Sequence, residues 1–229
     1  MKFRLAASTA AALLPVCLPA HVGRPMVVDD ATILDPGTCQ LESWTQRPQG
    51  RNEYWAVPAC RVGAWELGAG LGAIVPDGGS RYRSRVLQAK TIFHPLQTNG
   101  WGVGLSVADQ YRQGNGLAGD VSVLVPLTVS LLDDRVLVHA NAGWLRQHAS
   151  HSSGAQWAAG AEWAAAQRLT LTLETYGTAR GHGYAQAGLA VAAIPDRLAL
   201  DAGIRQRLGR GGLERYATVG LTWALPGLR

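Results

Sequence analysis

The chain has 229 residues, of which 47% are hydrophobic, 16% are charged and 28 are glycine. After the first twenty residues, no run approaches the roughly 18 consecutive apolar residues that a membrane-spanning helix needs, which argues against a helical membrane protein. The formal net charge of +5 is small and scattered over arginine-bearing loops, so nothing in the charge indicates a nucleic-acid partner.

Residues 1–20 have the pattern of a secretory signal peptide. Lys2 and Arg4 form a basic start, the apolar run from Leu5 to Leu18 is too short to cross a bilayer, and small Ala20 offers a cleavage site. Because this segment contains two basic residues and no acid, the exported chain carries a charge of +3. We therefore predict export from the cytoplasm.

A lipoprotein is the alternative for this N-terminus. Cys17 follows Leu14, Pro15 and Val16, and an acylated cysteine would anchor the chain by lipid instead. Because valine is a poor residue before an acylated cysteine, cleavage after Ala20 is the favoured prediction.

The mature chain is predicted to begin near His21, and residues 21–36 differ from everything after them. They are polar, contain Asp29, Asp30 and Asp35, and show no strand alternation. We predict either a periplasmic segment or a plug that folds into the lumen of the domain that follows.

From residue 37 to residue 229 the chain alternates apolar and polar residues, as in Leu-Thr-Leu-Thr-Leu-Glu from Leu169 to Glu174. A period of two places successive side chains on opposite faces of a strand. One face is apolar almost throughout, whereas a soluble sheet protein would show central strands that are apolar on both faces. In an exported chain this pattern predicts one all-β domain, a closed transmembrane antiparallel up-and-down β-barrel in an outer membrane.

Turn residues divide this domain into about twelve strands, most of them close to the roughly 9 to 11 residues that cross a bilayer. The predicted strands are Thr38–Arg47, Glu53–Val62, Ala64–Val75, Ser84–His94, Gly100–Tyr111, Asp120–Leu131, Arg135–Arg146, Ala155–Ala165, Arg168–Tyr176, Tyr184–Ile194, Leu198–Leu208 and Glu214–Leu225.

The connections between these strands alternate in kind. Polar, glycine-rich connections such as Pro76–Arg83 and Gln147–Gly154 take turns with short ones such as Gly63 and Pro195–Arg197. Long external loops and short periplasmic turns are typical of outer-membrane barrels. We therefore predict an even strand number and two periplasmic termini.

Strand parity assigns the faces of the predicted barrel. Outward positions are apolar, for example Leu67 and Leu71, Val121 to Val129, and Leu200 and Ile204 at every second residue. A lysine or arginine facing lipid at mid-depth costs about 2 to 4 kcal/mol, so the absence of charge at these positions is a strong constraint. The predicted lumen-lining polar residues are Glu42, Glu66, Lys90, His139, Asn141, Glu162, Glu174, Asp201, Arg205 and Arg207. The carboxylates among them can form ion pairs with the three basic residues.

The cysteines match an oxidising compartment. If Gln49 and Gly50 form the tip of the first hairpin, Cys39 and Cys60 lie directly opposite each other. This register predicts a structural disulfide on the outward face near the periplasmic rim. The alternative is a pair of free buried thiols.

The last predicted strand carries Thr218, Gly220, Trp223 and Leu225. This spacing resembles the C-terminal signal by which barrel proteins are handed to the outer-membrane insertion machinery. The short tail Pro-Gly-Leu-Arg after it is a departure from that pattern. We predict the insertion machinery and outer-membrane lipids as partners.

The start of the mature chain resembles a known family. Arg-Pro-Met-Val-Val-Asp-Asp-Ala at residues 24–31, Gly37, Gln-Leu-Glu at 40–42 and Gln-Ala-Lys at 88–90 are similar to outer-membrane barrels described as putative transporters of the MetA pathway of phenol degradation. The resemblance implies a channel for small, often aromatic or apolar, compounds. The present chain is compact for that group.

Two other motifs are weak. Residues 68–73, Gly-Ala-Gly-Leu-Gly-Ala, satisfy a dinucleotide fingerprint, but no βαβ unit surrounds them. His148 and His151 lie in a serine-rich loop without a third ligand. We predict neither a cofactor nor a metal site.

The favoured function is a narrow channel or transporter for small solutes in the outer membrane of a Gram-negative bacterium. Twelve strands make a barrel wider than those filled by side chains and narrower than open porins. A purely structural barrel is one alternative. An outer-membrane lipid hydrolase is the other, but His139 and His94 have no evident serine partner, and we predict that the protein is not an enzyme.

Overall fold

The computed structural model describes residues 26–112, 119–209 and 214–225. The predicted signal segment, Cys17 and the first residues of the mature chain lie outside the described residues. Within the described part no helix is long and apolar enough to span a membrane.

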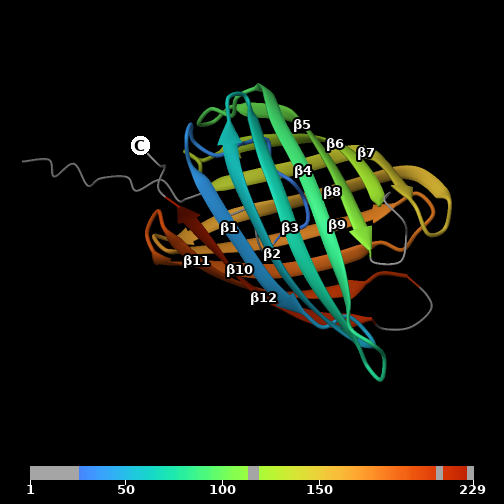
Figure 1. Cartoon of the computed structure of the whole chain (residues 1–229). Coiled ribbons are helices and arrows are strands. Elements are labelled where there is room, and N and C mark those ends of the chain that lie inside the picture. Colours follow the sequence, from blue (N-terminus) through green and yellow to red (C-terminus); the bar gives the residue numbers. More distant parts are fainter. Residues whose placement is uncertain (1–25, 113–118, 210–213, 226–229) are drawn as a thin grey trace, which may run out of the picture.

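Twelve antiparallel strands form a closed barrel (Figure 1). They are β1 Cys39–Gln46, β2 Arg51–Val62, β3 Trp65–Pro76, β4 Tyr82–His94, β5 Trp101–Arg112, β6 Asp120–Leu131, β7 Val136–Gln147, β8 Ser152–Ala166, β9 Leu169–Thr178, β10 Tyr184–Ile194, β11 Leu198–Arg207 and β12 Arg215–Leu225. The all-β barrel prediction is confirmed, and the predicted strand ends differ from the observed ones by at most about three residues, within the usual error of boundary prediction.

Each strand pairs with its neighbours in the chain, and β12 pairs with β1 to close the ring, as Figure 1 shows. Cys39 at the start of β1 lies opposite Leu225 at the end of β12. Both ends of the barrel domain therefore lie at one rim, which we call the terminal rim. The other end of the barrel is called the far rim.

The apolar face of the barrel is its outside. Leu71, Leu173 and Leu87 are each more than 60% exposed, whereas His139, Glu174 and Asp201 are almost completely buried. This is the reverse of a soluble protein, in which charged side chains are almost never fully buried unless paired. A belt of exposed leucine, valine and tryptophan is stable only against hydrocarbon.

The first hairpin has the predicted register. Cys39 lies opposite Cys60, and the two form a disulfide. The outward neighbours Tyr54, Ala56 and Pro58 on β2 are exposed, and Cys60 continues their alternation. The predicted disulfide on the outward face is confirmed; it links β1 to β2 at the terminal rim.

The glycine-rich residues 68–73 are part of β3 and so do not form a nucleotide-binding turn. Their glycines make room for large lumen side chains. A Cβ added at Gly72 would lie 2.8 Å from the Trp55 ring, and one at Gly70 would lie 2.5 Å from Val57. This part of the wall is therefore packed from the inside.

Candidate functional site

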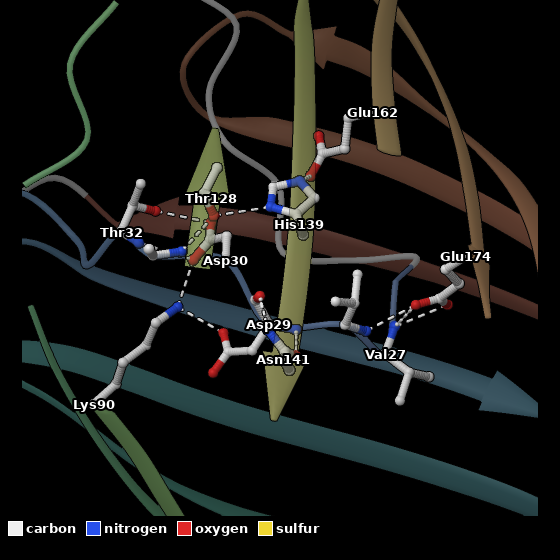
Figure 2. Close-up of polar contacts among 12 residues, drawn as sticks. Val27, Asp29, Asp30, Thr32, Lys90, Thr128, His139, Asn141, Glu162 and Glu174 are labelled. Atoms are coloured by element: carbon white, nitrogen blue, oxygen red, sulfur yellow. Dashed lines mark hydrogen bonds and ion pairs between the residues drawn. The ribbon is translucent and has the colours of Figure 1, made fainter. Parts of the chain in front are cut away.

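The N-terminal segment crosses the lumen before the chain enters β1 (Figure 2). Residues 27–34, which we call the strap, contact side chains from strands on several sides of the barrel. Most of these contacts are made by strap main-chain groups, which lie 27 to 147 residues away in sequence from the side chains that bind them.

Glu174 on β9 binds the start of the strap. Its carboxylate accepts hydrogen bonds from the N–H groups of Val27 at 2.8 and 2.9 Å and of Val28 at 2.7 Å. Charge-assisted bonds of this kind are about twice as strong as neutral ones. They also satisfy a carboxylate that is only 3% exposed.

Asn141 on β7 pairs with the main chain of Asp29 in both directions. Its Oδ1 accepts from the Asp29 N–H at 2.7 Å, and its Nδ2 donates to the Asp29 carbonyl at 2.8 Å. The side-chain amide thus takes the place of a neighbouring strand. One residue type supplies both the donor and the acceptor that an extended backbone requires.

Lys90 on β4 holds the acidic side chains of the strap. Its Nζ lies 2.6 Å from Asp29 Oδ1 and 2.5 Å from Asp30 Oδ1, and Figure 2 shows the amine between the two carboxylates. Asp30 also accepts hydrogen bonds from the Thr32 N–H and hydroxyl. The ion pairs that the structure shows for Lys90 are therefore with the strap, which brings two carboxylates close to the amine.

Thr128 and His139 bind the middle of the strap. The Ala31 N–H donates to Thr128 Oγ1 at 2.8 Å, and the same oxygen lies 2.9 Å from His139 Nδ1. His139 Nε2 lies 3.2 Å from Glu162 Oε1, close enough for an ion pair but not aligned as a hydrogen bond. Since Thr128 and His139 are no more than 1% exposed, this set is sealed beneath the strap.

The end of the strap is held near the terminal rim. Glu66 on β3 accepts from the Leu34 N–H at 2.9 Å, and Arg61 on β2 donates to the Leu34 carbonyl at 2.9 Å. At the opposite end, Met26 and Val28 pack with Ala158, and Tyr176 packs against this cluster. Strand parity alone did not single out Arg61 or Thr128 as binding residues.

Arg205 on β11 belongs to a second group in the lumen. It donates to Gln186 at 2.9 Å and to the Tyr216 hydroxyl at 2.7 Å, and its guanidinium lies over the rings of Tyr176 and Tyr216. Stacking on aromatic faces and hydrogen bonding stabilise this partly buried cation. The contacts that the structure shows for Arg205 are therefore with neutral side chains and aromatic rings.

The remaining predicted lumen residues are Glu42, Asp201 and Arg207. Glu42 lines the lumen cavity, Asp201 is buried, and Arg207 is the last residue of β11 at the far rim. The transport role assigned to all ten residues stays a prediction.

Beside the strap the lumen contains a cavity of about 1090 Å³. Its walls include Arg168 and Arg197 at the terminal rim and Gln46 and Gln110 near the far rim. Trp44 and Trp55 also line it and stack on each other, with ring centroids 5.7 Å apart and planes at 13°. The strap therefore narrows the lumen but leaves space beside it.

The part of the chain that the structure describes contains no group of three or more histidine, cysteine, aspartate or glutamate side chains that could hold a metal ion. The rings of His148 and His151 lie 5.9 Å apart in the β7–β8 connection.

Comparison with protein families gives one match. The family model described as "Uncharacterised conserved protein UCP029691" matches residues 10–223. The chain belongs to this family. This match does not test the resemblance of the N-terminal residues to the MetA-pathway family, which stays a prediction. No curated protein matches the sequence.

Solved structures with this fold include both channels and an enzyme. The NanC porin has a TM-score of 0.64 at 8% identity, covering 82% of this chain and 100% of that one. The COG4313 outer membrane channel from Pseudomonas putida F1 has a TM-score of 0.61 at 9% identity, with 86% and 98% covered. Outer membrane phospholipase A from Escherichia coli has a TM-score of 0.50 at 9% identity, with 81% and 92% covered. The chain therefore has the fold of outer-membrane β-barrels.

Proposed function

We propose that the protein is a narrow channel for small solutes in the outer membrane of a Gram-negative bacterium. The observation that carries this proposal is the lumen cavity, whose lining includes residues of both rims. The similar porin and channel structures support it. The exposed apolar belt supports a barrel wall that faces lipid, and the polar interior would then offer solutes a path across the membrane.

We infer the orientation of the barrel from the lengths of its connections. With the predicted signal peptide removed, both termini lie on the periplasmic side and the longer loops face outward, as in other barrels of this kind. We further propose that Gly220, Trp223 and Leu225 on β12 present the insertion signal to the assembly machinery and that outer-membrane lipids surround the belt.

The N-terminal segment acts as a plug in this proposal. Its contacts with β2, β3, β4, β6, β7 and β9 hold it across the lumen. Solutes then pass through the remaining space beside the plug. A variant lacking residues 26–34 is expected to conduct several-fold more current, and unchanged conductance would remove the plug from the proposal.

The class of solute is a finer proposal. The N-terminal residues that resemble the MetA-pathway family favour small aromatic or apolar compounds. The stacked Trp44 and Trp55 in the cavity wall offer such compounds an aromatic surface.

The hydrolase alternative has one observation in its favour. Thr128 Oγ1, His139 and Glu162 lie in the order of a nucleophile, a base and an orienting carboxylate. Against it, Thr128 Oγ1 already accepts the Ala31 N–H, and Thr128 and His139 are buried beneath the strap. We therefore assign the three residues a structural role in holding the plug.

Planar-bilayer recording of the refolded full chain tests the function. Discrete single-channel steps that candidate solutes block are the expected result. Fatty-acid release from phospholipid vesicles, measured in the same preparation, would indicate the enzyme. The absence of both current and hydrolysis would indicate a structural barrel.

A further inference from the structure

The strap is bound in a way that differs from the barrel strands. Among the described residues, the strand pairing that builds the barrel includes none of the strap positions 27–34. The N–H groups of Val27, Val28, Asp29, Ala31 and Leu34 are instead bound by barrel side chains. The strap is therefore held as a ligand is held, by side chains that project from a wall.

That wall is complete without the strap. The binding side chains project from β2, β3, β4, β6, β7 and β9, and the strand pairing that fixes these strands runs around the closed barrel. Groups placed on rigid strands are preorganised, which lowers the ordering cost of binding. Removing the strap would therefore leave the binding groups in position.

The site has recognisable chemistry. Glu174, Asn141, Thr128 and Glu66 accept backbone N–H groups, while Asn141 and Arg61 donate to backbone carbonyls. Such contacts suit any extended peptide, whatever its side chains. Lys90 adds specificity, because a ligand without two adjacent carboxylates would leave its amine poorly compensated in the lumen.

Apolar anchoring adds a second element of specificity. Met26 and Val28 pack beside Ala158, and a Cβ at Gly160 would lie 2.5 Å from Met26 Cε and 2.9 Å from Val28 Cγ1. Gly160 thus leaves the space that these two side chains fill. A ligand for this site needs apolar residues ahead of its acidic pair.

We propose that Arg61, Glu66, Lys90, Thr128, Asn141 and Glu174 form an interior binding site for an extended acidic peptide, and that the strap is its resident, displaceable ligand. The inference deepens the plug assigned under the proposed function, since it makes that plug exchangeable. A peptide of the same chemistry, supplied in trans, binds the same site when the strap is absent or weakened.

The direct test uses a labelled peptide with the sequence of residues 26–34 and blocked ends. Fluorescence anisotropy measures its binding to the refolded barrel lacking residues 26–34 and to the full chain. Saturable binding to the deletion variant, about tenfold or more tighter than to the full chain, is expected because the resident strap competes. Equal binding to both proteins, or to neither, would overturn the proposal.

Two controls separate the site from general attraction to the lumen. A peptide with asparagine in place of both aspartates should bind about tenfold more weakly, because Lys90 then lacks carboxylate partners. In the deletion variant, Glu174→Gln should weaken binding by a similar factor, whereas Glu53→Gln should not. Glu53 loses the same charge, but its partners are Arg51, Gln46 and Trp55 rather than the strap. Equal effects of the two substitutions would contradict the site.

A full-length variant covers the case in which the deletion does not fold. Asp29→Asn with Asp30→Asn keeps the strap but removes both ion pairs, so the added peptide should bind this variant more tightly than it binds the wild type. Unchanged peptide affinity would count against exchange. The binding readout needs no current: peptide binding without conductance would reject the channel alone, and conductance without peptide binding would reject this inference alone.

Discussion

Lys90 shows how one residue acquires its function from distant parts of the chain. Its position on the inward face of β4 follows from alternation, and Glu66 lies directly opposite on β3. Its amine nevertheless contacts Asp29 and Asp30, about sixty residues earlier in the chain. The flexible lysine side chain brings the amine to two carboxylates, and their charge offsets the hydration that the amine loses in the lumen.

Replacing Lys90 by methionine should loosen the strap. The two aspartates would lose their partner in a partly buried site, which costs about 1–3 kcal/mol. We expect amide hydrogen exchange of residues 27–31 to accelerate about tenfold or more, read by mass spectrometry.

Arg47→Gln is the matched control for that substitution. It also removes a cation from an ion pair, but the Arg47–Asp77 pair is more than half exposed on both sides, and exposed pairs contribute little. Strap exchange should stay at the wild-type rate. An equal acceleration in both variants would mean that loss of charge, rather than loss of the Lys90 contact, releases the strap.

At the scale of elements, the hairpin β1–β2 joins the strap to the barrel. The strap leads into β1 within a few residues, and the Cys39–Cys60 disulfide ties the first residue of β1 to β2. When the strap leaves its site, the strand to which it is connected stays covalently linked to β2. The strap can therefore be released without fraying of β1.

Replacing both Cys39 and Cys60 by serine should lower the free energy of unfolding. Closing a loop with a sequence separation of 21 restricts the unfolded chain, which corresponds to about 3 kcal/mol in the chain-entropy model. Urea titration followed by the gel mobility of folded and unfolded barrel would measure the loss. Wild-type protein titrated with reductant present should show the same midpoint as the double variant; a midpoint unaffected by either treatment would contradict the prediction.

At the scale of the whole molecule, the residue types on the outside of the barrel depend on whether they face acyl chains or water. Leu173 lies mid-way along β9 and is 64% exposed, while Leu208 follows β11 at the far rim and is 43% exposed. Both are accessible leucines, but only the first is at the depth of the acyl chains.

Leu173→Arg should destabilise the folded barrel in lipid by about 2–4 kcal/mol, whereas Leu208→Arg should cost about 0–1 kcal/mol. Unfolding titrations in phospholipid vesicles give both values. Similar costs for the two substitutions would indicate that the exposed belt does not face hydrocarbon.

The charges that line the cavity give a prediction about selectivity. Carboxylates outnumber basic groups there by two to one: the acids are Asp29, Asp30, Asp35, Glu42, Glu53, Glu66, Asp134 and Asp196, and the bases are Lys90, Arg168, Arg197 and Arg205. These charges create a negative electrostatic potential, and the low-dielectric wall of the barrel concentrates it along the lumen.

The reversal potential under a KCl gradient should therefore show a preference for cations. Glu42→Gln should reduce this preference, because Glu42 lies in the cavity wall. Gln206→Glu, at the outward parity of β11, adds a carboxylate outside the lumen and should leave the preference unchanged. An anion-selective current would contradict the prediction.

The sequence by itself determined the barrel and its faces. Strand alternation is a local property with a period of two, so the membrane solvent imposes it on every segment, and the hairpin register of Cys39 and Cys60 follows from the position of one turn. The tertiary structure decided what fills the barrel. Residues 27–34 carry no periodic pattern, and their partners Glu174, Asn141 and Lys90 become neighbours only when the ring closes. The contents of the lumen therefore depend on long-range contacts, because closure of the barrel places side chains that are distant in sequence around the strap.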